Sequence, residues 1–393
     1  MSELPVEIIF AILEQVYYRY RGNRGPFLWI SREPDYQTLS ACSLISSSWR
    51  RPAQNLLFNH ITADAASCLV YTISYFSACR QKNILDELLK HTRILDISLS
   101  QDISKPSRGN QNQCYPDDFV ALMKQCTNLY ELNLSVSGIF SLRSIITELQ
   151  DTTRPSRLRA LRIGRCSVQS PILYELLEFF PTIQFLTTEM EVAAPPPPSD
   201  RPSKVQLYEL AMFRTLPTEI CEWILSSSRE SLRVLEMRDL PSARVSRILE
   251  GYGPGLESFR TMKFNFNTAK LVKSCTSLRE LVLLGLPSVP PLRANDLPMT
   301  LEHLSLVHHH SDPSMDISDV MMAVKTLPKL RLLTSDAKFG MDPFYEVFQE
   351  ICIKRGIRVD ISTYGNWPND EPVKTVSFPR GRSTFNFRVM NWD

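Results

Sequence analysis

The sequence predicts an α/β solenoid, built from short parallel strands on one face and helices on the other. Its main sign is the pattern Leu-x-x-Leu-x-Leu, with other apolar residues at some positions, which recurs from residue 94 to residue 361. Between the copies the apolar spacing changes to about 3.6 residues, as in 141–149 and 171–179, which is typical of amphipathic helices. Each unit therefore reads as a strand, a turn and a helix.

The strand pattern returns at a regular interval. Its copies begin at Ile94, Leu129, Leu158, Ile183, Leu207, Leu232, Leu256, Leu278, Leu301, Leu330 and Ile357. The interval averages about 26 residues, and ~20–29 residues with this strand pattern is typical of leucine-rich repeats. We therefore expect about eleven repeats over residues 92–363. Their leucines should share one core, because a single unit cannot bury both its strand and its helix.

Proline and polar caps help to place the other elements. Helices are expected at 141–149, 171–179, 217–226, 243–249, 317–326 and 343–354. The tetrad Pro195–Pro198 predicts an extended surface loop at 193–203, and it could alternatively serve as a ligand for a domain with an aromatic groove. Residues 364–393 lack the repeat pattern and predict a C-terminal tail or cap.

Side chains between the leucines of each strand should point outward onto the sheet face. This face is the candidate binding surface for a target protein. Its expected contact residues are Glu131, Asn133, Arg162, Glu236, Arg238, Arg260, Glu280 and His303. Because they mix acidic, basic and small side chains, they predict no field of a single sign.

Charge and composition argue against several classes of function. The 44 Lys and Arg nearly balance the 42 Asp and Glu, without a basic cluster, so nucleic acid is not an expected partner. No apolar run is long enough to span a bilayer, and the first residues lack the basic region of a signal peptide. We expect a cytoplasmic or nuclear protein, neither secreted nor transmembrane. The nine cysteines contain no Cys-x-x-Cys pair and should be reduced.

An enzyme is not expected. The chain lacks the glycine-rich nucleotide loops, the His-Glu-x-x-His motif and the Gly-x-Ser-x-Gly motif. The triplet His308–His310 follows a strand, and consecutive extended residues point to opposite sides, so it is a poor metal site. We therefore predict no catalytic residue, metal, cofactor or small-molecule substrate.

The N-terminal segment has a different pattern. Residues 4–16 predict a short helix that begins near Pro5 and carries an apolar face, and a second apolar cluster follows over 38–61. The motifs are Leu4-Pro5-x-Glu7-Ile8, Ile12-Leu13, Leu39-x-x-Cys42-Ser43-Leu44-Ile45 and Trp49-Arg50 with Ala53. Residues 1–61 thus resemble an F-box, and Arg51–Ile61 is similar to the end of F-boxes in mushroom-type fungal proteins that carry leucine-rich repeats. Residues 62–91 would form a helical linker or N-terminal cap.

The resemblance implies a function. F-box proteins are substrate receptors of SCF ubiquitin ligases, in which the F-box docks on a Skp-family adaptor attached to a cullin and the repeats hold the target for ubiquitination. No catalytic group of the receptor is required, because proximity is the mechanism. The implied adaptor contacts are Leu4, Pro5, Ile8, Ile9, Ile12, Leu39, Leu44, Ile45 and Trp49. About half of them could instead hold the F-box together.

The segment 17–37 departs from the F-box pattern, in which the connection is much shorter. Its tyrosines and arginines are residue types that can bind RNA, but acidic residues follow them, so we expect a solvated loop. A binding scaffold of leucine-rich repeats outside any ligase is the alternative function.

Overall fold

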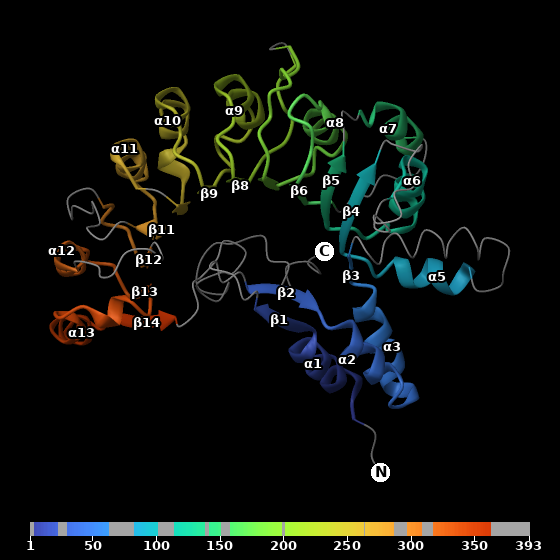
Figure 1. Ribbon diagram of the computed structural model, residues 1–393, viewed down its shortest axis with the longest axis horizontal. Helices are drawn as coiled ribbons and strands as arrows, with labels where there is room; N and C mark the ends of the chain where they lie inside the picture. The colour runs from blue at the N-terminus through green and yellow to red at the C-terminus, as the bar shows by residue number, and fades with distance from the viewer. Residues whose placement is uncertain are drawn as a thin grey trace.

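The computed structural model describes residues 4–22, 30–62, 82–100, 114–137, 141–150, 158–198, 201–262, 264–286, 297–308 and 317–362. Over these residues the chain forms a small N-terminal helical unit followed by a curved array of strands and helices (Figure 1). The strands line the inner side of the curve and the helices α6 to α13 line the outer side. The predicted α/β solenoid with a parallel sheet is thus confirmed.

A parallel sheet of 12 strands runs through the described residues in the order β14 to β3. Each strand pairs with the next one along the chain, as expected for stacked repeats. The strands are β3 (His60–Ile61), β4 (Ile94–Ser100), β5 (Glu131–Ser137), β6 (Ala160–Ile163), β7 (Phe185–Thr188), β8 (Glu209–Met212), β9 (Val234–Met237), β10 (Ser258–Thr261), β11 (Glu280–Leu286), β12 (His303–His308), β13 (Leu332–Asp336) and β14 (Arg358–Ser362).

The repeat helices, preceded by α5 (Lys82–Leu89), cover the convex side. They are α6 (Pro116–Gln125), α7 (Arg143–Gln150), α8 (Ile172–Phe179), α9 (Thr218–Leu225), α10 (Ala243–Glu250), α11 (Phe266–Ser274), α12 (Ser318–Thr326) and α13 (Tyr345–Lys354), with short 3-10 turns η1 (Gly253–Gly255) and η3 (Phe339–Met341). All six helices predicted by residue range within the repeats are present, with ends shifted by up to two residues. Helices α6 and α11 were not predicted, although Pro116 begins α6 and Asn265 caps α11. None of the described helices is long and apolar enough to cross a membrane.

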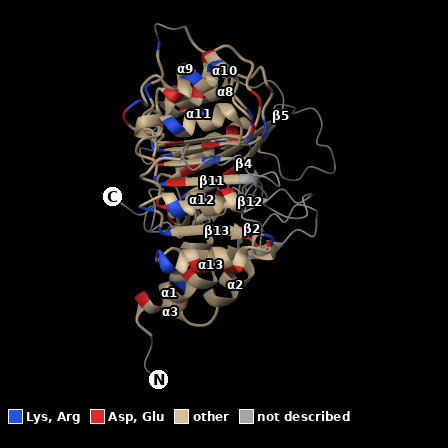
Figure 2. Cartoon of the chain, turned by 90° about the vertical axis from the view of Figure 1, so that its left-hand side faces the viewer, with Lys and Arg blue, Asp and Glu red and all other residues tan. Residues whose placement is uncertain are grey.

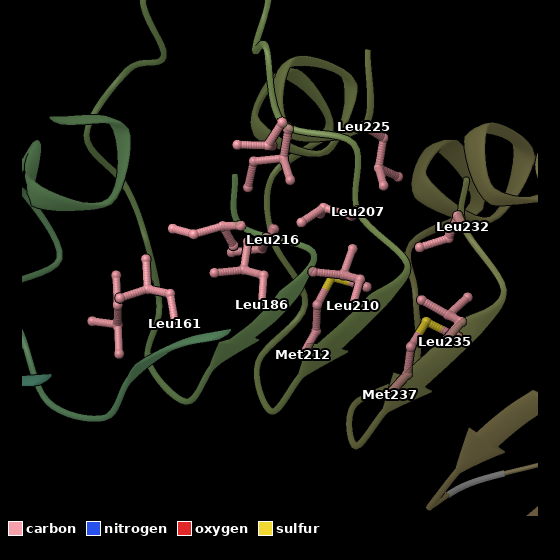
Figure 3. Close-up of a cluster of buried hydrophobic side chains, with 14 of the residues drawn as sticks. Leu161, Leu186, Leu207, Leu210, Met212, Leu216, Leu225, Leu232, Leu235 and Met237 are labelled. Atoms are coloured by element: carbon pink, nitrogen blue, oxygen red, sulfur yellow. The ribbon is translucent and has the colours of Figure 1, made fainter. Parts of the chain in front are cut away.

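The core lies between the sheet and the helices. Leu161, Leu186, Leu210 and Leu235 occupy one row across neighbouring strands, and each is at most 1% exposed. Figure 3 shows these side chains lined up on the helix side of the strands, with Met212 and Met237 in the next row. Because each unit contributes the same few positions, one continuous core runs through the array.

The first repeat has a different register from the one predicted. Leu95 pairs with Leu132 and Ile97 with Leu134, so the first apolar position of this copy is Thr92 rather than Ile94. Ile94 pairs with Glu131 and thus lies on the opposite face of the sheet. Because the first position of this copy is a buried threonine, Thr92, and not a leucine, the leucine pattern did not show the correct register. The sheet also begins earlier than residue 92, since β3 pairs with β4.

The helical unit contains α1 (Val6–Val16), α2 (Tyr36–Ser43) and α3 (Ser47–Leu57), which pack around Ile9, Leu13, Leu39 and Leu56. The carboxylate of Asp35 caps α2 by accepting a hydrogen bond from the Thr38 N–H at 3.1 Å.

The expected loop at 17–37 is instead built on a hairpin. Strand β1 (Tyr18–Gly22) pairs antiparallel with β2 (Ile30–Pro34), and Tyr17 is buried in the helical unit. The alternating tyrosines of Tyr18-Arg-Tyr20 are a strand signal that the charged residues masked. The predicted tail at 364–393 and the linker residues 63–81 lie outside the described residues.

Candidate protein-binding surfaces

The helical unit exposes a set of large apolar side chains on and just before α1 and at the C-terminal end of α2. Ile8 and Ile12 lie one turn apart on α1 and are 48% and 39% exposed. Leu44 and Ile45, at the end of α2, are 79% and 61% exposed. Leu4, just before α1, is also exposed. We call these five residues the N-terminal apolar surface.

The nine side chains expected to contact an adaptor divide into two groups. Leu4, Pro5, Ile8, Ile12, Leu44 and Ile45 are exposed and can be reached by a partner. Ile9 and Leu39 are fully buried, and Trp49 is half-buried and packs against the same core. These three support the helical unit from inside.

Two exposed residues next to this surface were not among the predicted contacts. Val6 and Val16 lie at the two ends of α1 and are 48% and 38% exposed. Helix α1 is apolar over more of its circumference than one packed face requires, and this excess is the signal that could have identified them.

The helical unit is joined to the sheet by polar contacts. The Tyr36 hydroxyl, from α2, donates to the His60 carbonyl at 2.6 Å. In the sheet, Nε2 of His60 lies 2.9 Å from Oδ2 of Asp96, whose other oxygen accepts from Asn133 at 2.6 Å. Burial alone would raise the pKa of Asp96, but the charge and hydrogen bond of His60, the hydrogen bond from Asn133 and the charge of Arg162 together lower this pKa.

The concave face of the sheet carries a connected polar network on β10 to β13. Glu280 accepts from the Ser258 hydroxyl at 2.7 Å and lies 3.0 Å from Nδ1 of His303. Nε2 of His303 in turn lies 2.9 Å from the Thr334 hydroxyl. Glu280 and His303 are both fully buried, which the sequence did not indicate.

Arginines extend this network toward β9. Arg260 lies 3.6 Å from both Glu236 and Glu280, and Arg238 lies 3.8 Å from Glu236. Burial lowers the pKa of Arg238 to about 10, against the opposing effect of Glu236. The side chains thus neutralise one another within the face.

The predicted target-contact residues all lie on the concave face, but their exposure differs. Asn133, Arg162 and Arg238 are partly exposed. Arg162 donates from Nε to Glu189 at 2.7 Å, which the sequence pattern did not reveal. The buried members of the predicted set are Glu131, Glu236, Arg260, Glu280 and His303.

A row of alternating charges precedes strands β9 to β13 and was also missed. Glu257 lies 3.4 Å from Arg233 and 3.8 Å from Arg279. Glu302 lies 2.9 Å from Arg279 and also contacts Arg331. We call this row the edge ladder. It links consecutive repeats through side chains just before each strand.

Metal-ligating side chains and buried thiols are the other groups of chemical interest. No group of metal-ligating side chains gathers among the residues that the structure describes. Burial raises the pKa of the Cys126 and Cys275 thiols to about 12, which makes them poor nucleophiles at neutral pH. Figure 2 shows basic and acidic residues intermixed on the described elements that face the viewer.

Comparisons with known proteins add little to this geometry. No protein-family profile matches the chain, and no curated protein matches it. Among solved structures, the chain is similar to a leucine-rich repeat-containing protein from Legionella pneumophila, with 16% identity and a TM-score of 0.41. That match covers 68% of this chain and 89% of the other. The chain's own repeats and sheet define its class as a leucine-rich-repeat fold preceded by a helical unit.

Proposed function

We propose that the chain is the substrate receptor of an SCF-type ubiquitin ligase. In this proposal the helical unit is an F-box that docks on a Skp-family adaptor, and the repeats bind the protein to be ubiquitinated. The observation that carries the proposal is the N-terminal apolar surface. Its five residues are all among the nine contacts implied by the F-box motifs, and Pro5, a sixth implied contact, is also exposed.

The energetics favour a partner on this surface. Fully burying an Ile or Leu side chain contributes about 1.5–3 kcal/mol. Ile8, Ile12, Leu44 and Ile45 are all more than a third exposed, so a partner would gain from covering each of them. Large contiguous apolar patches on monomeric proteins mark interaction sites, and this is the reason for proposing a partner here.

Target binding is proposed for the concave face. The partly exposed Asn133, Arg162 and Arg238 are the members of the expected set that a target can reach directly. The buried Glu280 and His303 would act by holding the neighbouring side chains in place.

Co-expression with a Skp-family adaptor and a cullin tests the proposal. The chain should purify as a stable complex with both, and Ile8→Asp should abolish the complex because a charge would be buried at the interface. Met341→Asp is the matched control, since Met341 is an exposed apolar residue on the far repeats, 75% exposed.

The same experiment distinguishes the ligase function from the alternative, a leucine-rich-repeat binding scaffold outside any ligase. A chain that binds no adaptor while remaining folded would contradict the ligase proposal and leave a leucine-rich-repeat scaffold. Adaptor binding without cullin recruitment would indicate an F-box that works outside a ligase.

A further inference from the structure

Strand β14 lies at one end of the sheet, in the last described repeat (Figure 1). Among the residues that the structure describes, it pairs with β13 along one edge and with no strand along the other. The Arg358 N–H donates to the Arg331 carbonyl at 2.9 Å, so Arg358 and Asp360 direct their backbone groups toward β13. Because this direction alternates along a strand, the N–H and carbonyl groups of Val359 and Ile361 point to the open edge.

The core is also less covered at this end. Leu304, Leu333 and Val359 lie in one row across β12 to β14. The two leucines are fully buried, whereas Val359 is partly exposed. In the next row Ser335 is buried and Ile361 is partly exposed. A stacked array needs a terminal unit that covers the last layer of its core.

The helix of this repeat leaves an apolar side chain uncovered as well. The Arg355 guanidinium, at the end of α13, donates to the Leu327 carbonyl at the end of α12 at 2.8 Å, which identifies the side of α13 that faces α12. Ile353 lies two residues earlier, about 200° around the helix, and is 71% exposed. It therefore points away from α12, toward the open end of the array.

The sequence after β14 carries two phenylalanines at the interval of the repeats. Equivalent core residues on β11 to β14 lie 23, 29 and 26 residues apart, at Leu281, Leu304, Leu333 and Val359. Phe385 lies 26 residues after Val359, and Phe387 lies 26 residues after Ile361. With Val389, these residues alternate with polar ones, which is the period of a strand.

The leading position of this copy, three residues before Phe385, is the polar Arg382. The first repeat likewise has Thr92 at its leading position. A polar residue there removes the leucine pattern, so residues 364–393 showed no repeat until the register of β13 and β14 fixed which positions to compare.

We propose that residues 384–389 add a further parallel strand to the open edge of β14 and close this end of the core. Phe385 would lie opposite Val359 and Phe387 opposite Ile361, so that the two rings cover the partly exposed rows. The segment is tethered to β14, and the 22 residues at 363–384 exceed the dozen or so that a parallel crossover needs. The proposal is independent of the ligase function, because it uses neither the N-terminal apolar surface nor the concave face.

Hydrogen exchange of the full-length protein, read by NMR at single residues, tests the proposal. The Val359 and Ile361 N–H groups should be protected in the wild type, because they would be bonded to the added strand. Phe385→Ser with Phe387→Ser should speed their exchange about tenfold or more. The Asp360 N–H, which faces β13, should stay protected in that variant and shows that the repeats remain folded.

The matched control is Asn386→Ser with Arg388→Ser, which changes the alternate side chains of the same segment and should speed exchange less than about twofold. Free exchange of Val359 and Ile361 in the wild type would overturn the proposal. So would unchanged exchange in the phenylalanine variant, or an equal effect in the control. Protection that is lost on dilution would also overturn it, because a second copy of the chain would then cover the edge.

Discussion

Nε2 of His60 lies 2.9 Å from Oδ2 of Asp96 and links the end of the helical unit to the second strand of the sheet. His60 belongs to β3, which continues directly from α3 and pairs with β4. The helical unit is therefore joined to the repeats through a strand rather than through a free linker. In a ligase receptor, such a joint would hold the target at a fixed position relative to the adaptor.

The first prediction concerns this joint. His60→Ala removes the imidazole partner of Asp96 and leaves a half-buried carboxylate with one fewer contact, so the pairing of β3 with β4 should weaken. The N–H groups of Arg93 and Ile94, which donate to the Asn59 carbonyl, should then exchange with solvent faster. Hydrogen exchange measures this, and unchanged protection at both amides would show that the imidazole contact does not hold the joint.

The second prediction concerns the buried network of the concave face. Glu280→Ala should destabilise the protein by about 3–5 kcal/mol, because Arg260 and His303 would lose a buried charged partner. Urea unfolding measures the loss. Glu257→Ala is the control, since this partly exposed carboxylate of the edge ladder should contribute no more than about 1 kcal/mol. Equal losses in the two variants would contradict the account.

The third prediction concerns pH. The hydrogen bond from Arg279 is the largest cause that lowers the pKa of Glu302 below its ordinary value of 4.5, and partial burial acts in the opposite direction. A lowered folded-state pKa gives stability that is present above the unfolded pKa and is lost as the pH falls through the folded one. The stability difference between wild type and Glu302→Gln should therefore be full above pH 5 or so and shrink in acid.

Unfolding measured at a series of pH values tests this dependence. A stability difference that stays constant from neutral pH into acid would show that the Glu302 charge contributes nothing through Arg279. High salt should reduce the difference at neutral pH, since the ladder is partly exposed to solvent.

The fourth prediction concerns the cysteines. With pKa values near 12, Cys126 and Cys275 should remain unlabelled by a maleimide at neutral pH and react only after denaturation. Cys42, which is half-buried, serves as the comparison. Peptide mass spectrometry reads the outcome, and fast native labelling of Cys126 would contradict its burial.

The repeating fold could be read from the sequence because the leucine positions alternate with outward residues at a fixed spacing in every unit. The frame failed at Thr92, where a buried polar residue replaces the leucine. The edge ladder and the Glu280–His303 pair could not be predicted, because each depends on the register between residues of different strands. The sequence also did not predict which residues of the N-terminal motif are exposed to solvent, since the motif contains both Ile8, which is exposed, and Ile9, which is buried.

The central claim is that the N-terminal apolar surface binds a Skp-family adaptor. Calorimetric titration of the purified adaptor into wild type, Ile12→Asp and Met341→Asp tests it most directly. We predict that wild type and Met341→Asp bind equally and that Ile12→Asp loses about 100-fold or more in affinity, which corresponds to about 2.7 kcal/mol. Absence of binding by the folded wild-type protein, or undiminished binding by Ile12→Asp, would contradict the claim.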